Sequence, residues 1–229
     1  MLLGETLTTA RSVSMDTMDS VLLLNRGDRF VVKALPAAAQ RAPVSSLCVS
    51  DFDGDGHDDV FLSQNLSTAH PFAERYDAGR GLWLRGDGRG GFVAEENSGV
   101  SVPGDGRGAA VCDYDGDGRV DLAVGQNGSE TTLWHNVGAR PGLRVRLSGT
   151  GGNPAAVGAR VRWKSADGYG PIREIHLGSG DGSCDDPTPV LGTGGRNVES
   201  VEIRWPGGAV STVPVVAGQL EVRAAPPAR

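Results

Sequence analysis

An acidic nine-residue segment occurs twice in this chain, as DFDGDGHDD from Asp51 and as DYDGDGRVD from Asp113, an offset of 62 residues. The same offset carries Phe30 onto Phe92, and the Gln-Asn pair at residues 64–65 also returns at that spacing. Similarity that continues beyond the acidic segment indicates a repeated structural unit rather than one repeated loop. This repeat restricts the fold more than any other feature of the sequence.

Each acidic segment has the pattern of a calcium-binding loop. Aspartate occupies positions 1, 3, 5 and 9, and glycine occupies positions 4 and 6. Alternate side chains point into such a loop, and the main-chain carbonyl of position 7 adds an oxygen, which suits a hard cation with six to eight oxygen ligands. The predicted ligands of the two calcium sites are Asp51, Asp53, Asp55, His57 and Asp59 in the first loop, and Asp113, Asp115, Asp117, Arg119 and Asp121 in the second. His57 and Arg119 are included for their carbonyl oxygens.

Other interpretations of the loops fit less well. An EF-hand needs glutamate at position 12, where this sequence has Leu62 and Val124. Magnesium keeps several of its waters, and no nearby Cys/His cluster indicates zinc. An acidic turn without an ion stays open as the alternative, because Asp-Gly pairs form good turns. However, two carboxylates a few ångströms apart repel by up to about 4 kcal/mol at an effective dielectric near 20, so four carboxylates in each loop favour a cation.

The composition favours an all-β protein with many turns. The 229 residues include 35 glycines and 13 prolines, aromatic residues make up 5%, and no long amphipathic helix is evident. The formal net charge is −6, and two bound calcium ions would reduce it to −2. The acidity therefore reflects the metal loops, and it argues against a nucleic-acid-binding surface.

The cysteines and the N-terminus give little information about disulfides or cellular location. Cys48, Cys112 and Cys184 are odd in number and lack metal-ligand spacing, so they imply no disulfide framework. Cys48 and Cys112 precede the two loops in apolar runs, where small buried thiols are expected. No export signal is visible, and no apolar run approaches membrane-spanning length.

The strand pattern around each loop is typical of a propeller blade. A strand precedes each loop, a second strand follows it, and a two-strand hairpin completes the unit, which gives four antiparallel strands in roughly 60 residues. The chain is predicted to contain the last hairpin of one blade at residues 21–35, a full blade at 44–96, and a further blade at 107–136. Propellers close with four or more blades, so this chain needs missing blades, an open stack or a homo-oligomer.

A different pattern begins at residue 140. Apolar and polar residues alternate in four segments, at residues 143–147, 159–163, 172–177 and 201–205, as in antiparallel strands with one buried face. A turn at residues 206–208 leads to further strands at 210–213 and 220–222. We therefore predict four regions: an irregular segment at 1–19, propeller blades at 20–139, a small β-sandwich or barrel at 140–224, and a tail at 225–229.

These motifs resemble two known families. The acidic loops look like the FG-GAP or VCBS repeats of integrin α-subunit propellers and bacterial surface proteins. The stretch from residue 142 to about 222 resembles an ASPIC/UnbV domain, through residues 158–161, 178–180 and 201–208. Together they are similar to the C-terminal portion of a cartilage-acidic-protein-like chain. The resemblance implies a calcium-binding, usually exported propeller, and hence an extracellular, cell-surface or periplasmic location.

The function expected from these features is calcium-stabilised binding of a protein or glycan partner. A calcium-dependent enzyme of the cyclase or lyase type is the first alternative, with acid or base residues near the long connection at residues 66–80. None of the four histidines has a partner in the sequence that indicates a catalytic triad. A structural fragment of a larger propeller protein is the second alternative.

Overall fold

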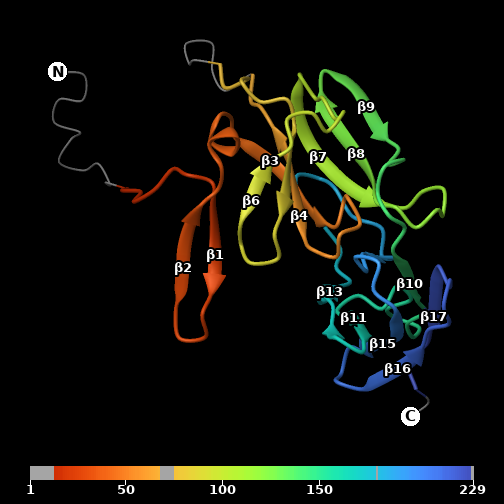
Figure 1. The fold of residues 1–229 in the computed structure, drawn as a ribbon. Coiled ribbons are helices and arrows are strands. Elements are labelled where there is room, and N and C mark those ends of the chain that lie inside the picture. The colour runs from red at the N-terminus through yellow and green to blue at the C-terminus, as the bar shows by residue number, and fades with distance from the viewer. Residues whose placement is uncertain (1–12, 68–74, 179, 228–229) are drawn as a thin grey trace, which may run out of the picture. The chain divides into compact units, whose positions relative to one another are not determined.

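The computed structural model describes residues 13–67, 75–178 and 180–227, and they form an all-β protein (Figure 1). The chain divides into two compact units, Met1–Leu35 and Pro36–Arg229. The one short helix among the described residues is a 3-10 turn, η2 (Ala37–Gln40). In this described part, no helix has the length and apolar character needed to cross a membrane. The predicted fold class, blades followed by a small β-sandwich, is confirmed.

The first unit is a β-hairpin. Strands β1 (Val21–Asn25) and β2 (Phe30–Ala34) pair in antiparallel register, as the sequence predicts. The turn between them is closed by the Asn25 side chain, whose Oδ1 accepts a hydrogen bond from the Gly27 amide at 2.8 Å. Gly27 has φ +89°, which a residue with a side chain rarely adopts. Residues 13–19 contain no strand, and the rest of the predicted irregular segment lies outside the described residues.

The second unit begins with a complete four-stranded blade. Its strands β3 (Val44–Ser50), β4 (Asp59–Gln64), β5 (Leu82–Gly86) and β6 (Phe92–Ala94) are antiparallel and lie in chain order. The first acidic loop joins β3 to β4. Residues 68–74 of the long connection, including His70 and Glu74, lie outside the described residues.

The second blade has three strands, β7 (Asp105–Cys112), β8 (Asp121–Asn127) and β9 (Ser129–Trp134), again antiparallel and in chain order. The second acidic loop joins β7 to β8, at the position that the first loop has in its blade. Apolar side chains of the two blades share one core, made of Cys48, Phe61, Val102, Ala109, Leu122 and Val124. Each acidic loop is thus fixed between two strands that bury one face in this core.

The C-terminal sheets, which comprise strands β10 to β17, form a sandwich. Their strands are β10 (Leu143–Leu147), β11 (Arg160–Ser165), β12 (Gly168–Tyr169), β13 (Arg173–Glu174), β14 (Val190–Leu191), β15 (Val198–Arg204), β16 (Val210–Pro214) and β17 (Glu221–Ala224). One sheet has the order β14-β10-β17, and the other has β12-β11-β15-β16 with β13 also on β11. Val145, Val161, Trp163, Val201 and Ile203 are central to the core between them.

One predicted strand is much shorter than expected. The sequence predicts a strand at residues 172–177, but only Arg173–Glu174 pairs with β11. Pro171 precedes this pair and has no amide to extend the ladder. On the neighbouring segment, Ala159 and Gly158 still exchange backbone hydrogen bonds with Ile175, at 2.8 and 2.7 Å, and the ladder ends at Gly158, which has φ +87°. The alternating pattern of residues 172–177 therefore predicted the burial of Ile175 correctly, but the strand that it predicted is too long.

Candidate metal centre

The first acidic loop is closed by its first aspartate. Oδ1 of Asp51 accepts hydrogen bonds from the amides of Gly54 at 2.7 Å and Asp55 at 3.1 Å, and Oδ2 accepts one from Gly56 at 2.7 Å. Gly54 and Gly56 have φ values of +75° and +93°, so glycine at positions 4 and 6 is required by the turn itself. The local sequence thus wraps the backbone around the carboxylate of position 1.

The last aspartate of the loop ties it to the sheet. Asp59 is fully buried; its Oδ2 accepts a hydrogen bond from the Phe52 amide at 2.9 Å, and its Oδ1 accepts one from the Gly86 amide at 2.8 Å. Because Gly86 ends β5, this carboxylate joins the loop to the third strand of the blade. Position 9 is therefore bonded both to its own loop and to the sheet.

The second loop repeats this geometry. Asp113 accepts hydrogen bonds from the amides of Gly116 at 2.8 Å, Asp117 at 3.1 Å and Gly118 at 2.9 Å. Asp121 is fully buried and accepts from the amides of Tyr114 at 3.1 Å and Asn136 at 2.8 Å. The 62-residue repeat seen in the sequence is therefore also a repeat of hydrogen bonds.

The structure brings together three of the predicted ligands in each loop. Carboxylate oxygens of positions 1, 3 and 9 lie within 4.8 Å of one another, in Asp51, Asp53 and Asp59 and in Asp113, Asp115 and Asp121. Position 5 is not in either set; Oδ1 of Asp55 and Oδ1 of Asp117 accept the amides of residues 57 and 119 at 2.8 and 2.9 Å. The gathered atoms are all carboxylate oxygens, the ligands that calcium takes, so the residues present fit this ion.

The side chains at position 7, Arg119 and His57, lie outside the two sets of gathered carboxylates. Nε of Arg119 donates to the Ala139 carbonyl at 2.7 Å, and its Nη1 forms an ion pair with Asp117. The ring of His57 lies beside Gly88 in the β5–β6 turn. Only the main-chain carbonyls of these two residues were predicted as ligands, so neither side chain is needed at the ion.

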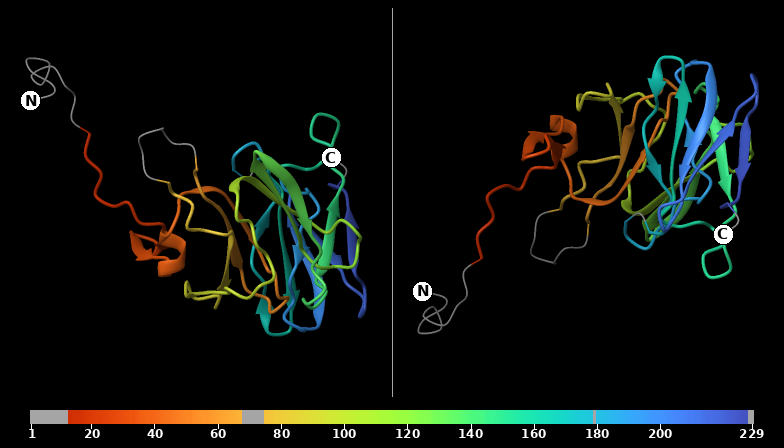
Figure 2. Two further views of the ribbon diagram at one scale, coloured as in Figure 1. Left: turned by 90° about the horizontal axis from the view of Figure 1, so that it is seen from above. Right: turned by 90° about the horizontal axis from the view of Figure 1, so that it is seen from below.

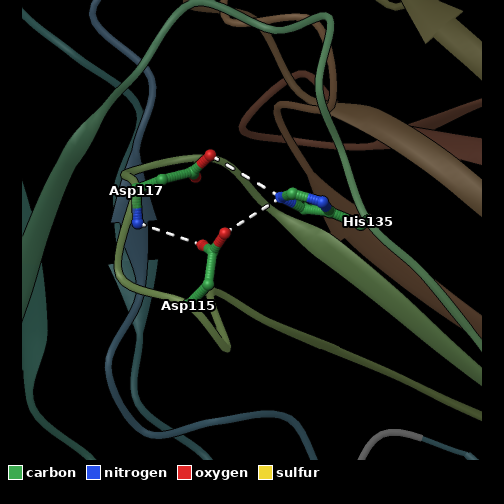
Figure 3. Close-up of side chains that lie close together, drawn as sticks. All are labelled: Asp115, Asp117 and His135. Carbon is green, nitrogen blue, oxygen red and sulfur yellow. Dashed lines mark hydrogen bonds and ion pairs between the residues drawn. The ribbon is translucent and has the colours of Figure 1, made fainter.

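His135 joins the second loop, and the sequence analysis missed it. It follows β9, and its Nε2 lies 3.0 Å from Oδ2 of Asp115 and 3.8 Å from Oδ2 of Asp117. Figure 3 shows the ring directed at both carboxylates. The Gly86 amide donates to Asp59 in the first blade, and the Asn136 amide donates to Asp121 in the second. The residues before these donors, Arg85 and His135, therefore occupy equivalent positions. Aligning the ends of the third strands would therefore have placed a basic residue beside each loop.

Burial makes three of the gathered carboxylates, Asp51, Asp59 and Asp121, harder to ionise. It raises the pKa of Asp51 and of Asp59 to about 6, against hydrogen bonds from backbone amides that lower both, and the charge of Asp53 adds to the rise. Burial also raises the pKa of Asp121. Burial opposes ionisation of Asp117 as well, but the amide and guanidinium of Arg119 outweigh it and lower that pKa. Buried anions that lack a cation are the electrostatic condition that a bound divalent ion relieves.

These pKa values predict how pH affects the protein when calcium is removed. Asp51 and Asp59 bind protons more tightly in the folded protein, at a pKa of about 6, than in the unfolded chain, near 3.8. The free energy of unfolding therefore falls as pH rises from about 4 to about 7. In chelator, we expect the melting temperature to be roughly 5 °C higher at pH 5 than at pH 7.

The control for this pH prediction is the double variant Asp51→Asn, Asp59→Asn, in which the slope should be nearly lost. With calcium present, the slope should have the opposite sign, because protons then compete with the ion. An unchanged slope in the double variant would assign the pH effect to other groups.

Two family models match this chain, one over the acidic loops and one over the C-terminal sheets. Residues 51–124 match the model of an FG-GAP-like repeat, which begins at the first ligand of the first loop and ends just after the second loop. Residues 149–227 match the ASPIC and UnbV model. The chain combines an FG-GAP-like repeat with an ASPIC/UnbV domain. This confirms the resemblance drawn from the acidic loops and from the C-terminal motifs.

Three relatives are similar in sequence to most of the chain, and all are named cartilage acidic protein 1. The Xenopus tropicalis protein is 29% identical over 186 residues, which covers 78% of this chain and 28% of the relative. The human protein is 27% identical over 201 residues, covering 84% and 29%, and the mouse protein is 29% identical over 189 residues, covering 79% and 28%. The chain spans less than a third of the length of these relatives.

Proposed function

We propose that this chain is a calcium-binding β-repeat module that holds one ion in each acidic loop. The observation that carries the proposal is the convergence of three carboxylates in each loop, with Asp59 and Asp121 fully buried. Neither of these two aspartates forms an ion pair among the residues that the structure describes. Two buried anions at matching positions, each beside two further carboxylates, need positive charge to be stable.

The role proposed for calcium is structural. Each loop joins two core strands, and an ion held by positions 1, 3 and 9 would fix the connection between them. The remaining predicted ligands, at positions 5 and 7, lie on the same loop and could complete the shell. We also propose that the boundary between the blades and the C-terminal β-domain lies near residue 140.

Calorimetric titration of the chelated full chain with calcium tests the proposal directly. We expect two ions per chain for the wild type, and one for each of the variants Asp53→Asn and Asp115→Asn. Asp167→Asn is the matched control, because Asp167 lies exposed in the β11–β12 turn away from both loops. Binding of two ions by both loop variants, or of none by the wild type, would refute the assignment.

The two sites should differ in affinity. In the second loop, Asp117 is paired with Arg119, and Oδ2 of Asp113 lies 3.0 Å from Nε of Arg144. Among the described residues, none of the four aspartates at positions 1, 3, 5 and 9 of the first loop forms an ion pair. Calcium affinity rises with the uncompensated negative charge of the ligands, so the first loop should bind about tenfold more tightly.

The same titration checks this difference. Asp53→Asn should remove the tighter phase of the isotherm, and Asp115→Asn should remove the weaker one. Two indistinguishable phases, or loss of the tighter phase in the Asp115→Asn variant, would contradict the argument from charge.

An extracytoplasmic setting and a protein or glycan partner complete the proposal. The relatives are named for cartilage, and millimolar extracellular calcium is enough to load loops of modest affinity. Catalysis would be favoured by a titratable pair in a cavity remote from both loops. The cavity of about 520 Å³ between the blades has Asp53 and His135 as its titratable lining residues, and both belong to or face the loops. A second cavity, of about 60 Å³, is lined by His176 and Asp185, whose Nε2 and Oδ2 atoms lie 3.7 Å apart, and by Ser50 and Cys112, which precede the loops. We propose a binding role because the loops carry the stronger evidence.

A further inference from the structure

The acidic loops of the blades lie against the C-terminal sheets. In both views of Figure 2 the green strands of the second blade overlap the teal and blue strands of the C-terminal sheets, and the Asp186 amide donates to the carbonyl of Val111 on β7 at 3.0 Å. The segment that joins the two parts is hydrogen-bonded to both loops. The Arg140 amide donates to the Asp53 carbonyl at 3.3 Å, and the Gly142 amide donates to the Gly118 carbonyl at 2.7 Å. Two residues of the connecting segment thus bond to the loops, Arg140 to the first and Gly142 to the second.

The close fit involves the loop glycines. A Cβ atom on Gly54 would overlap the main chain of Arg140, and one on Gly118 would lie 3.0 Å from the Gly142 carbonyl oxygen. On the other side, a Cβ atom on Gly192 would overlap the carboxylate of Asp51, so this predicted ligand rests directly on the C-terminal sheets. The Gly192 carbonyl in turn accepts a hydrogen bond from Nε1 of the core residue Trp163 at 2.8 Å. The contact surface is therefore complementary to the folded loop, not to an open one.

Two arginines of the C-terminal sheets make ion pairs with the loops. Nη2 of Arg173, on β13, lies 2.5 Å from Oδ1 of Asp58. Arg144, on β10, bridges Asp113 at 3.0 Å and Glu221 at 3.1 Å. The Arg144–Asp113 pair is largely shielded from solvent, with side chains 15% and 1% exposed, and the Arg173–Asp58 pair is partly shielded, with side chains 16% and 38% exposed. Such pairs are lost if the loop moves away.

We propose that calcium binding in the two loops and docking of the C-terminal sheets are coupled, so that each strengthens the other. Without the ion, repulsion among the three gathered carboxylates opens the loop and disturbs the surface on which the C-terminal sheets rest. With the ion, the closed loop presents its glycines and Asp58 in the geometry that the C-terminal sheets contact. Coupling of two equilibria is reciprocal, so a weakened contact lowers calcium affinity by the factor by which calcium strengthens the contact. This inference rests on the proposed function.

A substitution in the C-terminal sheets, opposite the first loop, distinguishes coupling from a direct electrostatic effect on the ion. In Arg173→Gln, the positive charge beside the first loop is removed, while every predicted calcium ligand is kept. Electrostatics alone predicts tighter calcium binding in this variant, because a cation no longer repels the ion. Coupling predicts the opposite sign, and we expect the affinity of the tighter site to fall about fivefold in the full chain. Arg160→Gln is the control, since Arg160 pairs with Glu174 on an exposed surface and should leave calcium affinity unchanged.

Hydrogen exchange of the wild type supplies a readout that does not depend on the affinity. The Gly142 and Asp186 amides donate across the contact, to the carbonyls of Gly118 and Val111. Chelation should speed their exchange about tenfold or more, whereas amides of the β11–β15 ladder inside the C-terminal sheets should be unaffected.

Two results would overturn the coupling alone: calcium binds but Arg173→Gln binds it equally or more tightly, or exchange at Gly142 and Asp186 does not depend on calcium. Absence of calcium binding by the wild type would overturn both the coupling and the proposed function.

Discussion

Chelation of calcium should lower the melting temperature of the full chain by roughly 10–20 °C. At a free calcium concentration of about a hundred times the dissociation constant, each site stabilises the folded state by about 2.7 kcal/mol, so two sites give about 5 kcal/mol. One kcal/mol shifts the melting temperature of a unit of this size by about 2–4 °C. The buried positions of Asp59 and Asp121 are the structural reason, because their negative charges are then left without a cation.

Differential scanning calorimetry in calcium and then in chelator measures this shift. The control is the double variant Asp51→Asn, Asp113→Asn, which lacks the first ligand of both loops and should melt at the same temperature in either buffer. A wild-type melting temperature that does not respond to chelator would show that calcium does not stabilise the fold.

The second large effect should come from the core of the first blade. Leu84, on β5, is fully buried, and Leu84→Ala should cost about 2–5 kcal/mol, because the removed atoms lose their burial and leave a cavity. Leu47, on β3 of the same sheet, is 50% exposed, and Leu47→Ala should cost less than about 1 kcal/mol. Denaturant unfolding of both variants in excess calcium compares the two costs directly.

Both substitutions remove the same atoms from the same sheet, so the difference between their free-energy costs measures the effect of burial. Similar costs for the two substitutions would mean that the two faces of this blade are equally buried, contrary to the fold described here. Calcium titration of both variants should give unchanged stoichiometry, since neither leucine lies in a loop.

Local patterns made much of this fold predictable. The period of two in residues 143–147 and 201–205, and the apolar runs beside each loop, depend on neighbours a few positions apart. The positions of glycine in the loops follow from the turn, since Gly54 and Gly56 both have positive φ. The orientation of position 1 follows in the same way, because the amides that orient Asp51 belong to the same loop, whereas position 9 also depends on the Gly86 amide of β5.

Contacts between distant segments could not be read from these patterns. Arg173 and Asp58 are 115 residues apart, and nothing near either one indicates the other. The placement of His135 beside Asp115 depends on where β9 ends in the blade, which the sequence analysis located only as a strand. The pairing of Arg119 with Asp117 was likewise missed, because position 7 was considered for its carbonyl alone. These are the contacts that distinguish the two loops, and all of them arise from tertiary packing or side-chain choice.

The parallel pairing of β10 with β17 bears on how the protein forms during synthesis. β10 directly follows the segment that touches both loops, but its neighbour β17 leaves the ribosome only after the other strands of both C-terminal sheets. The two blades, whose strands pair in chain order, can fold while the rest is still being translated. Arg144, which pairs with Asp113 of the second loop, therefore gains its second partner, Glu221, only late in synthesis. Until then, the folded blades carry their acidic loops without the complete Asp113–Arg144–Glu221 network.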